Sequence, residues 1–180
     1  DAQATDNFEE VHLVGHVVLR EQDGMEIAAD DAIYRDAVAS LEISGPMTFT
    51  DGRTSGSAVG ASYDKNQQLL TLRDQAVLHM AADTDGTGKF DATAHAMLVN
   101  RTTHFVSMDG NATIARERET INAETAQLHL SDDNHGVQMM ELHQHASIVP
   151  VGGSNTPEMR GDDITLEFQG DGRTIKHTQM

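Results

Sequence analysis

One group of histidine and carboxylate residues in this sequence has a spacing suited to a metal ion. Glu141, His143 and His145 alternate along one stretch, so on a β-strand they would share a face. Imidazole and carboxylate groups are common zinc ligands. The residues between them, Met140 and Leu142, are apolar, and an alternating apolar face is the one that turns toward a core. We therefore expect the three polar residues to face solvent, and we predict no metal site.

The remaining histidines divide into outward and inward positions. The same alternation directs His12, His16 and His129 outward. His95 differs, because the repeat described below gives it an inward position. We expect it to be a hydrogen-bonded interior residue, and polar contact with a ligand is the alternative.

No other residue pattern supports a catalytic or cofactor site. The sequence has no cysteine, which excludes disulfides, thiol nucleophiles and thiolate metal sites. Asp83, Asp85 and Gly86 lack the remaining ligands of a calcium loop and indicate a turn. The glycine-rich pieces lack the lysine of a phosphate-binding loop. We predict no catalytic residue and no cofactor.

Composition limits the possible partners. The chain has 180 residues, enough for one domain, and a formal net charge of −17, which disfavours nucleic acid. It has no Trp and only 4% aromatic residues, so its core must be built from Ala, Val, Leu, Ile and Met. No apolar run reaches the roughly 20 residues that cross a bilayer. Because the sequence begins at Asp1, we expect a mature or trimmed fragment from which any signal or anchor has been removed.

A repeat with a period of 29 residues predicts the architecture. Sliding the sequence by this interval superimposes Ala29 on Ala58 and Tyr34 on Tyr63 without a gap. Each unit consists of two predicted strands, and the second alternates strictly, as in residues 41–49. Looser copies follow toward the C-terminus. The sequence therefore predicts a series of antiparallel hairpins.

The first strand of each unit changes parity in its middle. Ile27 and Ala29 share one parity, whereas Ala32 and Tyr34 share the other. A flat strand would direct half of these side chains outward. A bulge or bend keeps all of them inside. We therefore predict that the strands bend at one level and stack into a curved, V-shaped sheet.

Turn chemistry separates these strands, and no helical periodicity persists over ten residues. We expect an all-β fold of about 10 to 11 strands. Residues 1–7 should be a disordered or trimmed tail. Residues 8–180 should form a single domain, and its last strand, from Thr174 onward, should be cut short by the end of the chain. The expected short turns are Asp23-Gly24, Asp51-Gly52, 64–66 and 170–172, and the expected longer loops are 83–88, 131–136 and 149–157.

This array of hairpins resembles the OstA-like family of lipopolysaccharide transport proteins, which includes LptA and LptC. The likeness is carried by residues 29–34 (ADDAIY), by residues 41–49 (LEISGPMTF) and by their copies. Residues 11–19 (VHLVGHVVL) resemble the family's G-x-V-x-L return strand. The likeness covers residues 8 to 180, and its specificity lies in the near-constant period of otherwise degenerate motifs.

The resemblance implies a twisted β-jellyroll, or slide, of stacked antiparallel hairpins in the periplasm. Its apolar groove would shelter the lipid A acyl chains of lipopolysaccharide, and other OstA-like Lpt proteins would join edge strand to edge strand. The protein would be soluble, or tethered to the inner membrane by a segment outside this chain. Adaptable methionines would suit such a lining. The groove-lining residues would be Ile27, Ala32, Tyr34, Ile43, Met47, Phe49, Ala61, Tyr63, Leu70, Leu72, Leu78, Met97, Val106, Met108, Ile114, Leu128, Met140, Leu142, Ile148, Ile164 and Leu166.

Two alternative interpretations stay open at this point. The first is a β-solenoid-like structural or interaction scaffold, in which the same apolar residues fill a closed core and take up no ligand. The second is a β-sheet enzyme such as a polysaccharide lyase or hydrolase, which would need acidic, histidine or tyrosine side chains converging in one cleft. The predicted outward position of the charged residues disfavours the enzyme.

Overall fold

The computed structural model describes residues 2–4, 10–84, 86, 88–131, 136–152, 157–170 and 174–180. These residues form one antiparallel sheet of 13 strands and one short 3-10 helix, η1 (Asp36–Val38), so the predicted all-β fold is confirmed. The strands are β1 (Ala2–Ala4), β2 (Val11–Arg20), β3 (Glu26–Arg35), β4 (Ser40–Asp51), β5 (Thr54–Asp64), β6 (Leu69–Met80), β7 (Phe90–Ala94), β8 (Ala96–Asn100), β9 (Phe105–Ala115), β10 (Glu119–Leu130), β11 (Val137–Pro150), β12 (Met159–Phe168) and β13 (Ile175–Gln179).

The sheet has more strands than the sequence predicted, for two reasons. Residues 2–4, expected to belong to a tail, form β1, which pairs with β2. The strand expected over residues 90–99 is broken at His95 into β7 and β8, which together occupy one place between β6 and β9. The rest of the tail (1 and 5–7) and parts of the predicted turns and loops (85, 87, 132–135, 153–156 and 171–173) lie outside the described residues.

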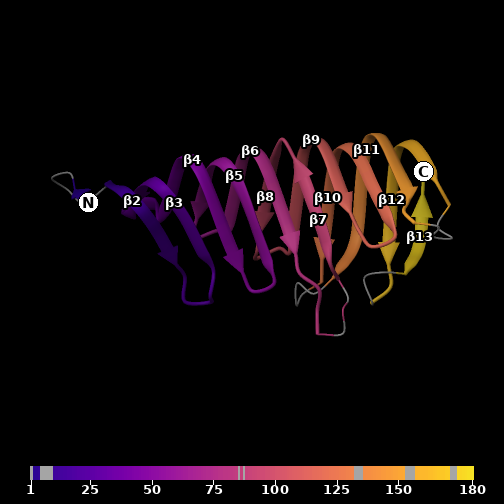
Figure 1. Ribbon diagram of the computed structural model, residues 1–180, viewed down its shortest axis with the longest axis horizontal. Helices are drawn as coiled ribbons and strands as arrows, with labels where there is room; N and C mark the ends of the chain where they lie inside the picture. The colour runs from indigo at the N-terminus through magenta and orange to yellow at the C-terminus, as the bar shows by residue number, and fades with distance from the viewer. Residues whose placement is uncertain are drawn as a thin grey trace.

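The long strands bend in their middle, so the sheet folds into two facing walls joined at a corner. The β2–β3 ladder is interrupted between Val14 and Val17, and the β4–β5 ladder between Ile43 and Pro46, at the level where the sequence predicts bends. Figure 1 shows the strands turning over along the upper side of the molecule. We call this side the corner, and the opposite side, where the hairpin turns lie, the mouth.

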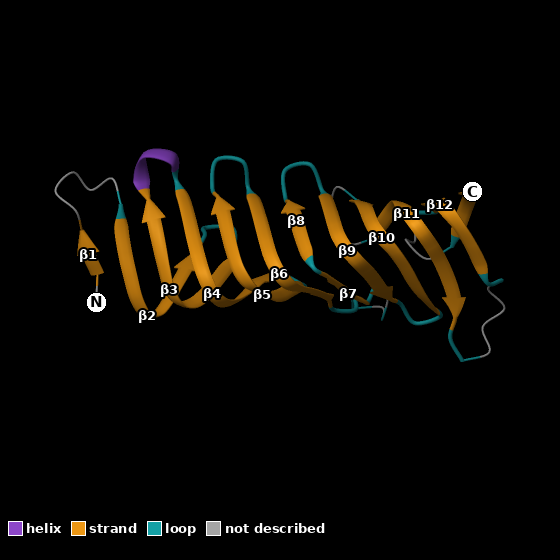
Figure 2. Cartoon of the chain, turned by 90° about the horizontal axis from the view of Figure 1, so that it is seen from above, coloured by secondary structure: helices purple, strands orange, loops and turns teal. Residues whose placement is uncertain are grey.

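The turns at the mouth form two rows, one for each wall. The first row comprises the turns after β3, β5, β8, β10 and β12, and Figure 2 shows those after β3, β5 and β8 along one edge. The second row comprises the turns after β2, β4, β6, β9 and β11. Backbone hydrogen bonds join successive turns of the first row, from the Lys65 N–H to the Ala39 carbonyl and from the Arg101 N–H to the Gln68 carbonyl. The rows are therefore parts of the sheet and not free loops.

Each return strand uses one more residue at the corner than the strand it pairs with. The inward residues on either side of the bend are Ala29 and Ala32 in β3, three positions apart, but Ile43 and Met47 in β4, four positions apart. This unequal count is a bulge, which bends a strand and increases its twist. Because bulges recur in most ladders, the curvature persists along the stack.

Left-handed backbone conformations accompany these corner bulges. In β9 the pair Gly110 and Asn111 has φ angles of 77° and 53°, and in β11 the pair Gln144 and His145 has 63° and 55°. Asparagine and glycine adopt this region readily. Gly110 has a second reason to be glycine, because an added Cβ would lie 2.8 Å from the His95 Cβ.

The inward side chains of both walls form a single hydrophobic cluster that runs from Met25 to Phe168. Alanines occupy it near the corner, where Ala61 and Ala126 are completely buried. Small side chains there allow the two walls to approach. Larger Leu, Ile, Met and Phe side chains fill the wider space toward the mouth.

The interior is tightly packed around Gly56 in β5. An added Cβ would collide with the Phe49 ring and with the backbone carbonyl of Val77. Overpacking of this kind costs about 1–3 kcal/mol. Gly56→Ala should therefore lower the free energy of unfolding by that amount in urea titrations.

Gly45→Ala is the matched control, because nothing lies within 4 Å of its added Cβ and its φ is ordinary. We expect it to change stability by less than about 1 kcal/mol. Equal destabilisation by the two substitutions would contradict the packing described for β5.

Candidate functional site

The interior between the walls contains every residue that the sequence predicts to line a groove. All of them are buried except Tyr34, which is partly buried and packs against the cluster. In the middle of the stack Leu72, Met108 and Leu128 are completely inaccessible to solvent. The lining is thus aliphatic and methionine-rich, and its side chains contact one another. Two openings next to it, at the N-terminal end and at the mouth, have a mainly apolar lining.

One apolar opening lies at the N-terminal end of the stack. It has a volume of about 240 Å³ and is lined by side chains of β2, together with Tyr34 and Leu41. β1 pairs with Val11 to Leu13 of β2, and among the described residues no other strand lies along the outer edge from Val17 to Arg20. The interior cluster is therefore accessible from this end.

A second opening, which we call the mouth cavity, lies between the two rows of turns. Its volume is about 280 Å³. Its apolar lining includes Phe49, Leu78, Phe105 and Leu130, and Arg101 stands at its polar rim. Hydrocarbon could reach the interior cluster here only by passing between the two rows.

Arg101 connects the two rows across the mouth cavity. It begins the first-row turn after β8, and its side chain is 17% exposed. Its Nε donates to an Asp51 carboxylate oxygen at 2.7 Å, and its Nη1 lies 2.8 Å from Asp23. Both aspartates belong to the second row. We call this group the Arg101 clasp.

Lys65 makes a similar bridge one turn earlier. It begins the first-row turn after β5, the position that Arg101 holds after β8, and its Nζ lies 3.1 Å from Glu21 of the second row. The Asp64 and Asn100 side chains shape the two turns identically, each accepting hydrogen bonds from the backbone N–H groups two and three residues later. The repeated turn therefore presents a cation to the opposite row at successive levels.

A third contact spans the mouth near the C-terminal end. The Arg116 guanidinium of the second row lies 4.7 Å from the centroid of the Phe168 ring in the first wall. Arg116 also pairs with Glu119, which is 7% exposed. An opening of about 390 Å³ adjoins this contact, and its lining is mainly polar and charged. Hydrocarbon fits the other two openings better.

The charges of the Arg101 clasp hold one another in the ionised state. Burial would raise the pKa of Asp23, but hydrogen bonds from Arg101 and from the Met25 N–H lower it overall. Burial would lower the pKa of Arg101, but Asp23 and Asp51 raise it overall. The hydrogen bond to Glu21 likewise raises the pKa of Lys65. At neutral pH these groups form ion pairs across the mouth.

The histidine predicted to be interior is at the corner instead. His95 has 65% of its side chain exposed, and its Nδ1 lies 3.1 Å from Asp74. The prediction was wrong because the parity change in this unit comes later than in the others, so Ala94 and Met97 take the inward positions.

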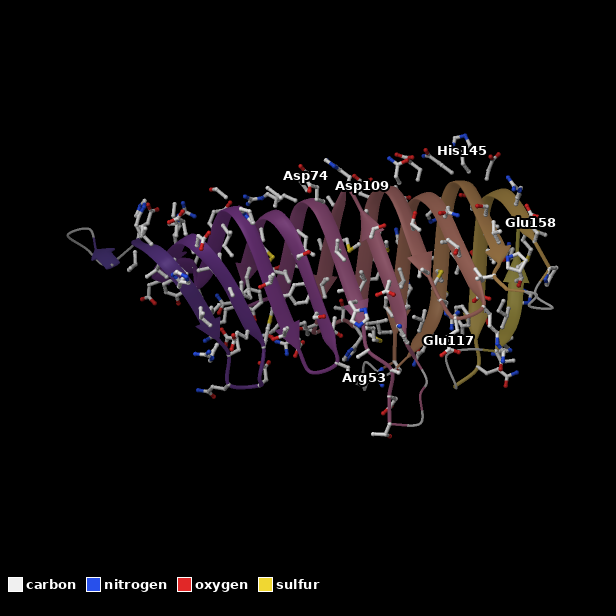
Figure 3. All side chains as sticks on the ribbon, in the orientation of Figure 1. Arg53, Asp74, Asp109, Glu117, His145 and Glu158 are labelled. Atoms are coloured by element: carbon white, nitrogen blue, oxygen red, sulfur yellow. The ribbon has the colours of Figure 1, made fainter. Side chains whose placement is uncertain are left out.

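The histidines predicted to face outward do so, and they do not converge. Glu141 faces His129 on the neighbouring strand, whereas His143 faces Asp163 on the other side. His145 lies at the corner, as Figure 3 shows. Within the part of the chain that the structure describes, no three His, Asp or Glu side chains approach as a metal site would require.

Sequence reasoning missed the Arg101 clasp. A signal was present, because Lys65 and Arg101 each follow an Asp or Asn that begins a turn. Its partners could not be found from the sequence, since Asp51 and Arg101 are 50 positions apart.

The described residues contain one helix, the short η1, and no helix among them is long and apolar enough to cross a bilayer.

Comparisons with known proteins agree with this architecture. A family model described as the LptA/(LptD N-terminal domain) LPS transport protein matches residues 1–134. No curated protein matches. Among solved structures, the crystal structure of LptH from Pseudomonas aeruginosa is similar, with a TM-score of 0.55 and 19% sequence identity over 60% of this chain and 77% of that one. LptH is described as the LptA homologous periplasmic component of the lipopolysaccharide transport device. At this identity the likeness supports the fold alone.

The lowered pKa of Asp23 gives the clasp a pH dependence. A carboxylate whose pKa is depressed in the folded state stabilises the fold above its ordinary pKa of 3.8, and this stabilisation is lost as pH falls through the folded value. Asp23→Asn should therefore be less stable than the parent at pH 6. The difference should vanish in acid, below the folded pKa of Asp23, when urea unfolding is measured across this range.

Asp109→Asn is the control, because Asp109 lies at the corner, away from the mouth (Figure 3). It should not reproduce the pH-dependent difference of Asp23→Asn. A constant offset between Asp23→Asn and the parent at every pH would show that the clasp does not determine the ionisation of Asp23.

Proposed function

Since this chain belongs to the LptA/LptD N-terminal domain family of lipopolysaccharide transport proteins, we propose that it carries lipopolysaccharide through the periplasm by sheltering lipid A acyl chains between its two walls. The family is one of transport proteins and not of enzymes. The periplasmic placement is supported by the description of LptH as a periplasmic component. The protein would bind and pass on its lipid without a chemical step.

The observation that carries this proposal is the continuous aliphatic interior with apolar openings at the N-terminal end and at the mouth. Each methylene that leaves water gains about 0.8 kcal/mol, so a few acyl chains supply a large driving force. The middle of the interior is filled in this conformation, so uptake requires the walls to part and methionine side chains to rearrange. Methionine suits this role because its side chain is flexible and polarizable.

The two ends of the sheet support the second part of the proposal, which is edge-to-edge joining with other Lpt domains. Among the described residues, β13 pairs with β12 alone, and β1 pairs with only part of β2. Val18 of β2 is 42% exposed. Unpaired strand edges are templates for added strands. A partner with the same fold could continue the sheet and its apolar interior at either end.

The near-complete burial of the middle of the interior favours one competing function. A structural scaffold with a solid core would show the same inaccessible Leu72 and Met108 and would take up no lipid. The two functions differ in whether acyl chains reach the apolar openings, and photo-crosslinking can decide between them.

A photoreactive p-benzoylphenylalanine at Leu130, which lines the mouth cavity and packs against the interior cluster, should form adducts with purified lipopolysaccharide. The same residue at Leu19, which lines the N-terminal opening, should also do so. Both sites are partly exposed, so the bulky group should not disrupt the filled interior. Adducts are detected by gel electrophoresis and immunoblotting against lipopolysaccharide.

Val77, on the outer face of β6 and 37% exposed, is the control position. It should give no adduct under the same illumination. If Leu130, Leu19 and Val77 were labelled equally, or if none were labelled, the scaffold function would replace the transport function.

A further inference from the structure

Positive side chains are concentrated on one side of the V-shaped section of the sheet, whereas carboxylates lie on both sides. The corner carries carboxylates such as Asp74 and Asp109, and among the described lysines and arginines only Arg73 lies beside it. The other described lysines and arginines lie in or next to the hairpin turns. Figure 3 shows Asp74 and Asp109 on the corner side and Arg53 on the mouth side. In a chain of net charge −17, an anion would therefore meet cations chiefly at the mouth.

Among these cations, Arg53 and Arg101 line the mouth cavity, and Arg101 is the one that pairs with Asp23 and Asp51 across it. The same lining includes Phe49, Leu78 and Leu130. A guanidinium beside hydrocarbon-lined space is the arrangement that suits an amphiphile with a charged head and apolar chains. The guanidinium is mostly buried, so an anion that reached it would be little screened by solvent.

Near Arg101 lies the buried hydroxyl of Tyr63, whose capacity to form hydrogen bonds is not fully satisfied. Tyr63 is 1% exposed, and burial raises the pKa of its hydroxyl, with a further increase from Glu21 and a decrease from Arg101. Its hydroxyl interacts with the Arg101 guanidinium, which is a donor, but has no hydrogen bond of good geometry to an acceptor among the described residues. An incoming acceptor could therefore take the hydrogen bond that this buried hydroxyl can donate.

We propose that Arg101 is the headgroup-recognition residue of this protein and binds a phosphate of the lipid after exchanging it for the carboxylates of Asp23 and Asp51. The proposal deepens the transport function and rests on it. In the closed conformation the two aspartates occupy the guanidinium and hold the two rows of turns together. When acyl chains enter the mouth cavity, the phosphate takes the place of the aspartates, and the rows separate.

Phosphate is a suitable competitor for this exchange. Arginine binds phosphate and carboxylate in the same bidentate manner, so a phosphate can replace the two-pronged contact that the guanidinium makes with Asp51. The exchange also couples recognition to opening, because the anion that occupies Arg101 releases the ion pairs that cross the mouth. A lipid without phosphate would have to separate Arg101 from its aspartates without replacing them.

Binding of two lipid A forms by the whole chain tests this proposal. One is the bis-phosphorylated form, and the other is the same lipid with both phosphates removed. Both are presented in micelles of a neutral detergent, and Kd is measured by thermophoresis. The parent should prefer the phosphorylated form by roughly tenfold, which is about 1.4 kcal/mol. Arg101→Gln should abolish this preference while still binding the dephosphorylated form.

Two further variants separate recognition from folding. Asp23→Asn combined with Asp51→Asn removes the competing carboxylates at constant size, so it should increase the preference for the phosphorylated form above that of the parent. Arg73→Gln also removes an arginine that pairs with a carboxylate, Glu42 of β4, but away from the mouth. Arg73→Gln should keep the preference of the parent.

Inorganic phosphate at millimolar concentration distinguishes a headgroup site from a site for free phosphate. We expect it not to displace the lipid, because it brings no acyl chains. Displacement that depends on Arg101 would overturn the headgroup assignment.

The remaining outcomes distinguish the proposal from the transport function. If the parent and Arg101→Gln bound both lipids with the same ratio of Kd values, Arg101 would be a structural clasp only, and the transport function would stand. If the parent bound neither lipid, the transport function would fail, and the Arg101 proposal would fail with it.

Discussion

The structure depends on one constraint, which is that a β-strand that bends must still direct the apolar side chains of both its halves to the same side. Side chains alternate along a strand, so a bend is compatible with an apolar interior only if the residue count at the corner is right. In β3 the inward residues on either side of the bend, Ala29 and Ala32, are three positions apart. In β4 the corresponding residues, Ile43 and Met47, are four positions apart. The bulges that result curve every level alike, and the stack becomes two walls with a shared interior.

An interior made in this way has a closed corner and an open mouth. At the corner, alanines and left-handed residues such as Asn111 bring the walls together. At the mouth no backbone hydrogen bond among the described residues joins the walls, since each row of turns hydrogen-bonds along its own side. Side chains make the connection there, through Lys65, Arg101 and Arg116. Ion pairs and a cation–π contact separate more readily than a packed apolar seam, which agrees with the proposed uptake of hydrocarbon at the mouth.

The distribution of charge adds to this division. Carboxylates at the corner keep the outside of the bend in water, and the scarce cations gather near the turns. The net charge of −17 therefore does not predict what the mouth can bind, because the Arg101 guanidinium lies beside the apolar lining of the mouth cavity. Local placement of a few cations decides the chemistry of an opening even in a strongly acidic protein.

The sequence by itself determined the all-β class, the serial hairpins, the bends and the inward parity of residues such as Leu72 and Met108. These features follow from alternation and from turn residues, which act between near neighbours in the chain. The tertiary structure alone decided that the middle of the interior is filled, that His95 lies outside, and that Arg101 reaches Asp51. Such contacts depend on how far apart the two walls stand and on which levels face each other across the mouth. No local pattern encodes these distances, because the curvature accumulated over many strands fixes them.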